Sequence, residues 1–315
     1  MAAVDVTGLV DRARDGEPRA VARLISLVEQ GSSALPSVAA ALAPFTGNAQ
    51  VVGITGAPGV GKSTSTNALV RAFRSAGKRV AVIAVDPSSP FSGGALLGDR
   101  VRMGDHATDT GVFIRSMATR GHLGGLSWAT PQALRVLDAA GFDVILVETV
   151  GVGQSEIEVV ALADTTLVLL APGMGDGIQA AKAGILEIAD VFVVNKADRD
   201  GADQTARDLK YMISLGRRDR SGPLWRPPVV KTVAASDSGA DAVVEAIAAH
   251  QSWMAEHGEL AARRLRRAGA EIEAIAVDRV RTRFGPVDGL AERVVAGELD
   301  PFAAAEQLIS GNLRA

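Results

Sequence analysis

The chain has 315 residues with 47% hydrophobic and 22% charged side chains, which is typical of a soluble globular protein with a sizeable core. Its formal net charge of −3 gives no reason to expect nucleic-acid binding, and no apolar run reaches the roughly 18 residues that span a membrane. Because the chain contains no cysteine and begins without a secretory signal pattern, we expect no disulfides, no thiolate metal sites and a cytoplasmic location.

Residues 1–47 are predicted to form a helical extension. Apolar side chains recur at helical spacing between residues 5 and 45, and Pro18 suits the first turn of a second helix. These helices form either a structural pair packed on the main domain or a cap that binds a partner protein.

Residues 48–252 alternate between strand and helix patterns. The predicted strands, most of them rich in Val, Ile and Leu on both faces, are 51–55, 80–85, 111–115, 143–148, 165–171, 190–194 and 228–233. The predicted helices between them are 62–76, 131–140, 155–162, 178–188, 203–215 and 238–249. This alternation predicts the α/β class: a mostly parallel central sheet flanked by helices, with ligands at the carboxyl ends of the strands.

The first predicted strand leads into a glycine-rich turn of the form G-x-x-x-x-G-K-[ST], and a predicted helix follows it. Small residues in such a turn let phosphate oxygens reach successive backbone N–H groups, and the helix dipole adds attraction. Lys62 can reach the outer phosphates, and the Ser63 hydroxyl can bind Mg²⁺. The sequence therefore predicts a P-loop that binds a nucleotide through Gly56, Ala57, Pro58, Gly59, Val60, Gly61, Lys62, Ser63 and Thr64.

The connection between residues 86 and 111 is long and rich in Gly, Ser and Pro, as functional loops often are. Asp86 at its start and Asp99 within it are candidate Mg²⁺ ligands, although a carboxylate after a strand is also a common turn residue. Transition-state charge could be neutralised by Arg100, Arg102, Arg115 or Arg120, and the sequence selects none of them.

Glu148 ends the strand 143–148, and Gly151 follows it, where many P-loop GTPases have Asp-x-x-Gly. The acid of that motif holds magnesium through water, and the glycine N–H meets the γ-phosphate. Val152 stands where many GTPases have a glutamine that orients the attacking water. We therefore predict slow intrinsic GTP hydrolysis that a partner or a conformational change accelerates.

Asn195, Lys196 and Asp198 form N-K-x-D directly after the strand 190–194. The Asp198 carboxylate can accept hydrogen bonds from the guanine ring N–H and the exocyclic amine. Adenine would leave this carboxylate unpaired, so the motif predicts GTP and GDP rather than ATP.

The loop after the next predicted strand stands where a loop closes over the base. Its residues Ala234, Ala235 and Ser236 are candidate base contacts. The alternative is a plain strand-to-helix loop in which Ser236 or Asp237 caps the following helix.

Residues 253–315 are predicted to form a C-terminal helical arm. The segment 256–284 interleaves arginines with acidic residues around a sparse apolar stripe. Either this segment is a solvated helix, or it buries its stripe against a second subunit.

The two nucleotide motifs define only a superfamily, and four further stretches match a narrower group: residues 85–90, 97–103, 113–121 and 148–155. With them, the chain resembles the methylmalonyl-CoA mutase-associated GTPases, the MeaB/ArgK group of metallochaperone-type P-loop GTPases. The resemblance covers about residues 50–236, and Asp-Pro-Ser-Ser and Arg-Ser-Met-Ala-Thr-Arg-Gly are its most specific elements. The base-closing loop departs from the family, in which a version beginning with serine is commoner.

The resemblance implies a homodimer joined through the C-terminal arm. It also implies a chaperone that binds an adenosylcobalamin-dependent acyl-CoA mutase, with methylmalonyl-CoA mutase the first candidate, gates cofactor loading and protects the mutase from inactivation. In that family Asp86, Asp99 and Glu148 would surround Mg²⁺, and Gln179 and Lys182 would respond to the mutase. The predicted catalytic residues are thus Lys62, Glu148, Gly151, Gln179 and Lys182.

Three rival functions fit the sequence less well. A metal-insertion chaperone usually carries a Cys or Cys-His cluster, and this chain has no cysteine and only four scattered histidines. N-K-x-D argues against a transport-associated ATPase or kinase. A partitioning-type ATPase needs a lysine near the start of the P-loop, where Ala57 stands.

Overall fold

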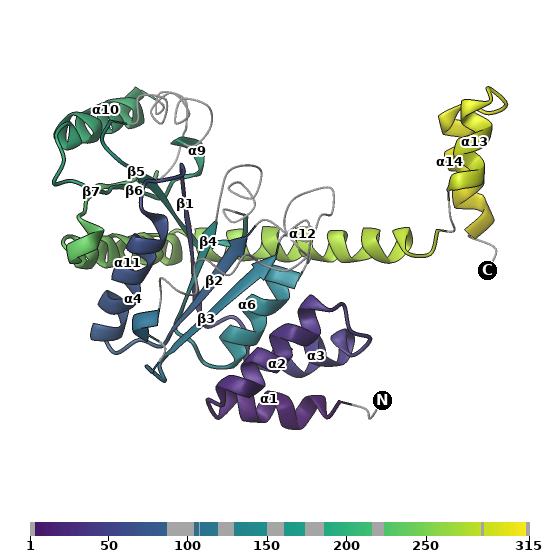
Figure 1. Cartoon of the computed structure of the whole chain (residues 1–315), viewed down its shortest axis with the longest axis horizontal. Helices are drawn as coiled ribbons and strands as arrows, with labels where there is room; N and C mark the ends of the chain where they lie inside the picture. The colour runs from purple at the N-terminus through teal and green to yellow at the C-terminus, as the bar shows by residue number, and fades with distance from the viewer. Residues whose placement is uncertain are drawn as a thin grey trace. The chain divides into compact units, whose positions relative to one another are not determined.

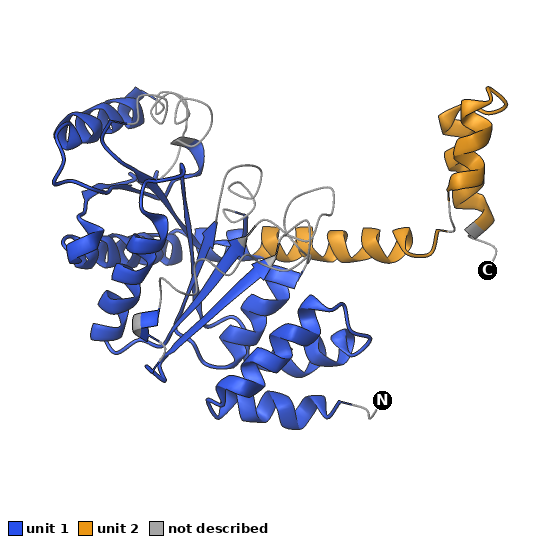
Figure 2. Cartoon of the chain, in the orientation of Figure 1, with its two compact units in different colours: residues 1–264 blue, residues 265–315 orange. Residues whose placement is uncertain are grey.

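The computed structural model of the chain describes residues 4–86, 104–106, 108–118, 129–149, 161–173, 186–215, 224–284 and 287–312. The fold divides into two compact units, residues 1–264 and residues 265–315 (Figure 2).

A seven-stranded sheet forms the centre of the first unit (Figure 1). Its strand order is β3-β2-β4-β1-β5-β6-β7, and every described pair of strands is parallel. The strands are β1 (Gln50–Gly56), β2 (Val80–Asp86), β3 (Val112–Ala118), β4 (Val144–Thr149), β5 (Thr165–Leu170), β6 (Val191–Val194) and β7 (Val229–Lys231). All seven predicted strands are present, with ends that differ by at most a few residues.

Most of the predicted helices of the main domain are confirmed. The structure has α4 (Lys62–Ser75), η2 (Gly104–His106), α6 (Ala129–Ala139), α9 (Leu186–Ile188), α10 (Ala202–Leu215), η4 (Ala234–Ser236) and α11 (Ala240–Glu256). Most of the predicted helices 155–162 and 178–188 lies outside the described residues.

Alternate residues of the strands supply buried clusters on both faces of the sheet, because neighbouring residues of a strand point to opposite faces. Val52 and Ile54 pack against α4 and α11 on one face. On the other face, Val51 belongs to the cluster that contains the α6 side chains. On the same face, Phe192 of β6 packs in a separate cluster with α10. Burial on both faces explains the continuous apolar runs of these strands.

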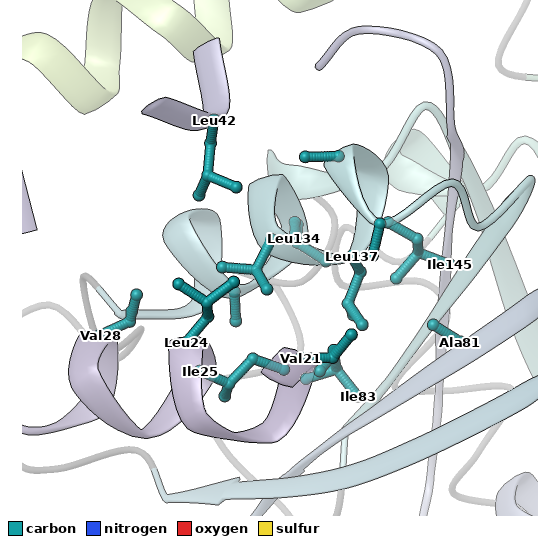
Figure 3. Packing of buried hydrophobic residues seen from close by; sticks show 14 of the residues in the cluster. Val21, Leu24, Ile25, Val28, Leu42, Ala81, Ile83, Leu134, Leu137 and Ile145 are labelled. Atoms are coloured by element: carbon teal, nitrogen blue, oxygen red, sulfur yellow. The ribbon is translucent and has the colours of Figure 1, made fainter. Parts of the chain in front are cut away.

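The N-terminal extension contains three helices rather than the predicted pair: α1 (Val6–Arg14), α2 (Pro18–Glu29) and α3 (Leu35–Leu42), followed by the 3₁₀ turn η1 (Ala43–Phe45). The short α3 consists mostly of small apolar residues, which give a weak periodic signal. Figure 3 shows Leu24 and Ile25 of α2 beside Leu134 and Leu137 of α6. The extension therefore shares one continuous core with α6 and the sheet.

Buried charges at the amino ends of β5 and β6 hold the start of the helix α12 (Glu259–Arg281). Arg263 donates to both carboxylate oxygens of Asp190, each over 2.8 Å, and Arg264 donates to Asp164 Oδ2 over 3.0 Å. The buried His250 Nε2 lies 3.2 Å from Asp190 Oδ1, outside hydrogen-bond geometry. Burial lowers the pKa of His250 despite the nearby Asp190 carboxylate, so this imidazole is neutral near pH 7.

The second unit consists of the rest of α12 and two helices, α13 (Asp288–Val295) and α14 (Pro301–Asn312). The sequence predicted a helical arm over 253–315 and described its segment 256–284, where α12 lies, but it did not predict α13 separately. Among the described side chains of this unit, Ala304 alone is buried. Large apolar side chains are correspondingly exposed, above all Val295 (89%), Phe302 (85%) and Leu265 (75%).

No helix in the described ranges is both long enough and apolar enough to cross a lipid bilayer.

The shared core predicts that the N-terminal helices stabilise the whole first unit. Leu24→Ala, which truncates a fully buried side chain, should lower the free energy of unfolding by about 2–5 kcal/mol because it leaves a cavity. Chemical denaturation measures the change. Tyr211→Ala, at a side chain that is 65% exposed on α10, should cost less than about 0.5 kcal/mol. Equal effects of the two changes would contradict a shared core.

Candidate functional site

The strand order brings the predicted motifs to one edge of the sheet. β1, which leads into the P-loop, lies between β4, which ends near Glu148, and β5. β6, which precedes Asn195, and β7 follow on the same side. Because all these strands are parallel, their carboxyl ends meet at one edge, where α/β proteins bind ligands.

The P-loop turns into the N-terminus of α4 through a glycine. Gly61 has a left-handed conformation (φ 93°) and, as the N-cap residue of α4, has no side chain of its own that could bond to the first backbone N–H groups. The Lys62 ammonium group is buried against the loop and donates to the carbonyl oxygens of Gly56 over 2.6 Å and Ala57 over 3.3 Å. This arrangement places a cation and the positive end of a helix dipole at one point.

Two P-loop glycines are required by close contacts. A Cβ atom at Gly61 would lie 2.5 Å from Asn195 Nδ2, and a Cβ at Gly56 would lie 2.4 Å from the carbonyl oxygen of Leu169. Both distances are too short for any side chain. Gly61 thus lets the Asn195 side chain approach the P-loop.

Glu148 is 1% exposed and receives hydrogen bonds from two hydroxyls of α4. Ser63 Oγ lies 2.7 Å from Glu148 Oε1, and Thr66 Oγ1 lies 2.9 Å from Glu148 Oε2. These bonds compensate for the cost of burying the carboxylate. The sequence did not single out Thr66, although a polar residue on the buried face of the predicted helix was a usable signal.

The Asn195 side chain connects three segments of the site. Its Nδ2 donates to the carbonyl oxygen of Val60 in the P-loop over 2.8 Å. Its Oδ1 accepts from Thr232 Oγ1 over 3.2 Å and from the backbone N–H of Ala234 over 3.0 Å. The P-loop and the loop after β7 therefore have fixed positions relative to the N-K-x-D motif.

The other two residues of N-K-x-D point to different places. Lys196 has a left-handed conformation (φ 57°), and its Nζ donates to the carbonyl oxygen of Gly59 over 2.6 Å. Asp198 is exposed in the turn that follows. Asp198 forms no ion pair with another residue in the described ranges. Its carboxylate can therefore bind a guanine base without first breaking an ion pair.

The candidate base contacts Ala234, Ala235 and Ser236 form the 3₁₀ turn η4. Ala234 is buried, whereas Ala235 and Ser236 are exposed. The backbone N–H of Ala234 reaches Asn195, so this loop belongs to the same edge of the sheet as the P-loop.

Several predicted site residues cannot be placed as side chains. Asp99, Gly151, Gln179 and Lys182 lie outside the described residues. For Asp86 only the backbone is described: it ends β2, whose residues Ala84 and Val85 pair with Glu148 and Thr149 of β4. The backbone of Asp86 therefore lies at the same edge as Glu148.

The site suits a metal that takes few protein ligands. No group of three or more His, Asp or Glu side chains that could hold a metal occurs within the described residues. Ser63 gives its hydroxyl hydrogen to Glu148, and the oxygen of a donating hydroxyl can also be a ligand of a cation. Mg²⁺ in phosphate sites binds through one or two such oxygen ligands together with substrate phosphates, so the donors present fit this ion.

A family model described as methylmalonyl Co-A mutase-associated GTPase MeaB matches residues 21–286. The chain belongs to the MeaB family of GTPases. The resemblance inferred from the motifs is therefore confirmed, and so is GTP hydrolysis as the activity.

Relatives agree with this membership of the MeaB family. A protein of Pyrococcus horikoshii named as a GTPase is 47% identical over 305 residues, which are 96% of each chain. GTPase ArgK of Escherichia coli is 39% identical over 80% of this chain and 77% of its own. The crystal structure of an LAO/AO transport system kinase covers 100% of both chains with a TM-score of 0.71 and 27% identity, and confirms the P-loop GTPase fold.

The bridging role of Asn195 predicts a double effect of Asn195→Ala. The change leaves the buried N–H of Ala234 and the Val60 carbonyl unpaired, so the free energy of unfolding should fall by about 1–3 kcal/mol. GDP affinity should fall as well, because the P-loop and the loop after β7 lose the side chain that joins them. Denaturation and calorimetric titration test both effects. Gln204→Ala, which removes an exposed amide on α10, should change neither quantity. If Asn195→Ala changed neither the free energy of unfolding nor the GDP affinity, the bridging role would be refuted.

Proposed function

We propose that this MeaB-family GTPase is a chaperone of an adenosylcobalamin-dependent acyl-CoA mutase, methylmalonyl-CoA mutase first among the candidates. In this role it gates cofactor loading and protects the mutase from inactivation. The description of the family as mutase-associated carries the proposal. A mouse relative named methylmalonic aciduria type A homolog, 36% identical over 82% of this chain, supports it further. The proposal keeps the cytoplasmic location predicted from the cysteine-free composition.

The nucleotide lies, in this proposal, across the carboxyl edge of the sheet. The backbone of residues 56–64 and the Lys62 ammonium bind the phosphates, and Asp198 accepts from the guanine ring N–H and exocyclic amine. Asn195 and Lys196 position the P-loop, to which both donate. Ala234, Ala235 and Ser236 line the far side of the base.

Mg²⁺ would be held by Ser63, with Glu148, Asp86 and Asp99 around it. When bound, the ion neutralises charge that develops on the β- and γ-phosphates. Glu148 fixes the Ser63 hydroxyl so that its lone pairs point away from the carboxylate. Thr66 occupies the second carboxylate oxygen and so holds Glu148 in that orientation.

Hydrolysis is slow in this proposal until the partner rearranges the site. Gly151 would meet the γ-phosphate through its N–H, and Gln179 and Lys182 would respond to the mutase. On the phosphate side, Glu148 already accepts from two hydroxyls, so the proposal gives this carboxylate no general-base role. Positioning and charge neutralisation remain as the means of catalysis.

The arm 253–315 would join two copies of the chain. Exposed apolar side chains on α12, α13 and α14, among them Leu265, Ile272, Val295 and Phe302, favour burial against another surface over a solvated helix. A homodimer through this arm is therefore part of the proposal.

A transport-associated kinase that uses ATP is the alternative raised by the name of the neighbouring crystal structure, and membership of a GTPase family argues against it. The N-K-x-D motif and the exposed Asp198 carboxylate favour guanine. Base preference separates the two functions.

Base preference should depend on Asp198. The wild-type protein should bind GTP well above ATP, and Asp198→Asn should weaken GDP binding by about 1.5–3 kcal/mol, the contribution of hydrogen bonds to a charged group. The same change should favour xanthosine diphosphate, whose 2-carbonyl can accept from the new amide. Titration calorimetry measures the affinities, with Asp200→Asn in the same turn as control. A wild-type preference for ATP would support the kinase reading.

The chaperone role predicts mutase-dependent hydrolysis. Phosphate release from GTP should be slow for the protein alone and should rise when a methylmalonyl-CoA mutase from the same source is added. Lys62→Ala should lower the rate about 100-fold or more, because it removes a cation aimed at the phosphates. Lys210→Ala, at an exposed lysine on α10, should leave the rate unchanged. A rate that ignores the mutase would refute this partner.

A further inference from the structure

The loop of residues 233–238, here called the base loop, is closed by its own backbone. Val233 N–H donates to the Ser238 carbonyl over 2.9 Å, and Ser236 N–H donates to the Val233 carbonyl over 3.0 Å. Asp237 has a left-handed conformation (φ 58°), which non-glycine residues adopt at a cost that Asp and Asn bear most easily. The loop therefore has a defined shape, and its contacts with neighbours decide where it lies.

The inner side of the base loop offers few contacts to hold it. Ala234 donates its N–H to Asn195 and packs with Ala68 of α4 and Ala240 of α11. These are small side chains, and their contact area is correspondingly small. Ala235 is exposed. On its inner side the loop is therefore held at Asn195 by one hydrogen bond and by a small apolar contact.

The outer side is held by a charged pair. Arg71 of α4 donates from Nε to Asp237 Oδ2 over 2.8 Å and from a second guanidinium nitrogen to Asp237 Oδ1. A bidentate pair of this kind fixes orientation as well as distance, because both planar groups must align. Arg71 lies on the helix that begins with Lys62 and Ser63. The base loop is thus joined to the phosphate-binding helix at a second point.

We propose that Arg71 and Asp237 are positioning residues that set the guanine affinity of this GTPase. They hold the base loop against α4, so that the phosphate side and the base side of the nucleotide site keep a fixed separation. The inference rests on the proposed nucleotide site. Neither residue touches the nucleotide in this assignment, and both act through the loop.

The pair should affect nucleotide binding more than folding. Arg71 and Asp237 side chains are 35% and 47% exposed, and exposed ion pairs contribute little to stability. Hydrogen bonds to a base, in contrast, weaken steeply when their angle and distance change. A small displacement of the loop therefore reduces guanine binding without unfolding the protein.

The helix supplies a matched control pair one turn further on. Arg74 donates to both carboxylate oxygens of Asp109, over 2.8 and 2.9 Å, with side chains 28% and 33% exposed. The hydrogen bonds from Arg74 hold the pKa of Asp109 below its ordinary value. This pair joins α4 to the segment before β3 and not to the base loop.

The experiment compares Arg71→Gln, Asp237→Asn and the double variant with Arg74→Gln and Asp109→Asn. Asparagine keeps the preference for a left-handed backbone at position 237 and removes only the charge. The readouts are the dissociation rate of a fluorescent methylanthraniloyl-GDP, competition by inorganic pyrophosphate, which has no base, and the melting temperature without nucleotide.

Each single change in the pair should raise the GDP dissociation rate about three- to tenfold, within the range of coupling between contacting side chains. The double variant should match the singles rather than multiply them, since both changes remove one interaction. Pyrophosphate affinity and the nucleotide-free melting temperature should stay at wild-type values. The control variants should leave the GDP dissociation rate unchanged.

Three results would overturn the inference: an unchanged dissociation rate in Arg71→Gln and Asp237→Asn, an equal rise in the control variants, or an equal loss of pyrophosphate affinity. An Asp198→Asn protein that binds GDP as the wild type does would refute the nucleotide-site assignment itself, and the role of the pair with it. If GDP binding depends on Asp198 but the GDP dissociation rates of the Arg71 and Asp237 variants equal that of the wild type, only the positioning role of the pair is refuted.

Discussion

The site depends on one side-chain amide that joins its own motif to two loops. Asn195 stands at the end of β6, donates to the P-loop carbonyl of Val60 and accepts from Thr232 and Ala234 after β7. Its approach requires Gly61, where any Cβ would collide with the amide nitrogen. The phosphate-binding and base-binding segments come from distant parts of the chain, and this buried amide sets their spacing.

A second constraint lies on the phosphate side, where a buried carboxylate organises two hydroxyls. Glu148 would be costly to bury alone, and Ser63 and Thr66 satisfy its two oxygens. Glu148, which stands where many GTPases have the shorter aspartate, thus has defined partners in this structure. It reaches across from β4 to the first turns of α4 and orients the residue that the motif assigns to the cation.

The opposite edge of the sheet holds the start of α12. Asp190 immediately precedes β6, and its bidentate contact with Arg263 fixes the start of α12. Asn195 follows the same strand at the other end. The four buried residues of β6 therefore connect the start of α12 to the nucleotide site. The charges at the start of α12 are paired, because an unpaired charge is strongly unfavourable in a buried position.

The sequence by itself determined the class of fold, the seven strands and the residues of the nucleotide motifs. Apolar runs of strand length and a P-loop between a strand and a helix are local patterns. Such patterns can be recognised in the sequence without knowledge of the fold. The sequence could not determine the third N-terminal helix, because α3 is short and alanine-rich. It could not pair Thr66 with Glu148 either, because the two residues lie 82 positions apart in the chain. Contacts such as Asn195 with Val60 and Arg71 with Asp237 join residues more than a hundred positions apart. Only the order of the strands brings them together, and that order follows from packing over the whole sheet rather than from any one stretch of the chain.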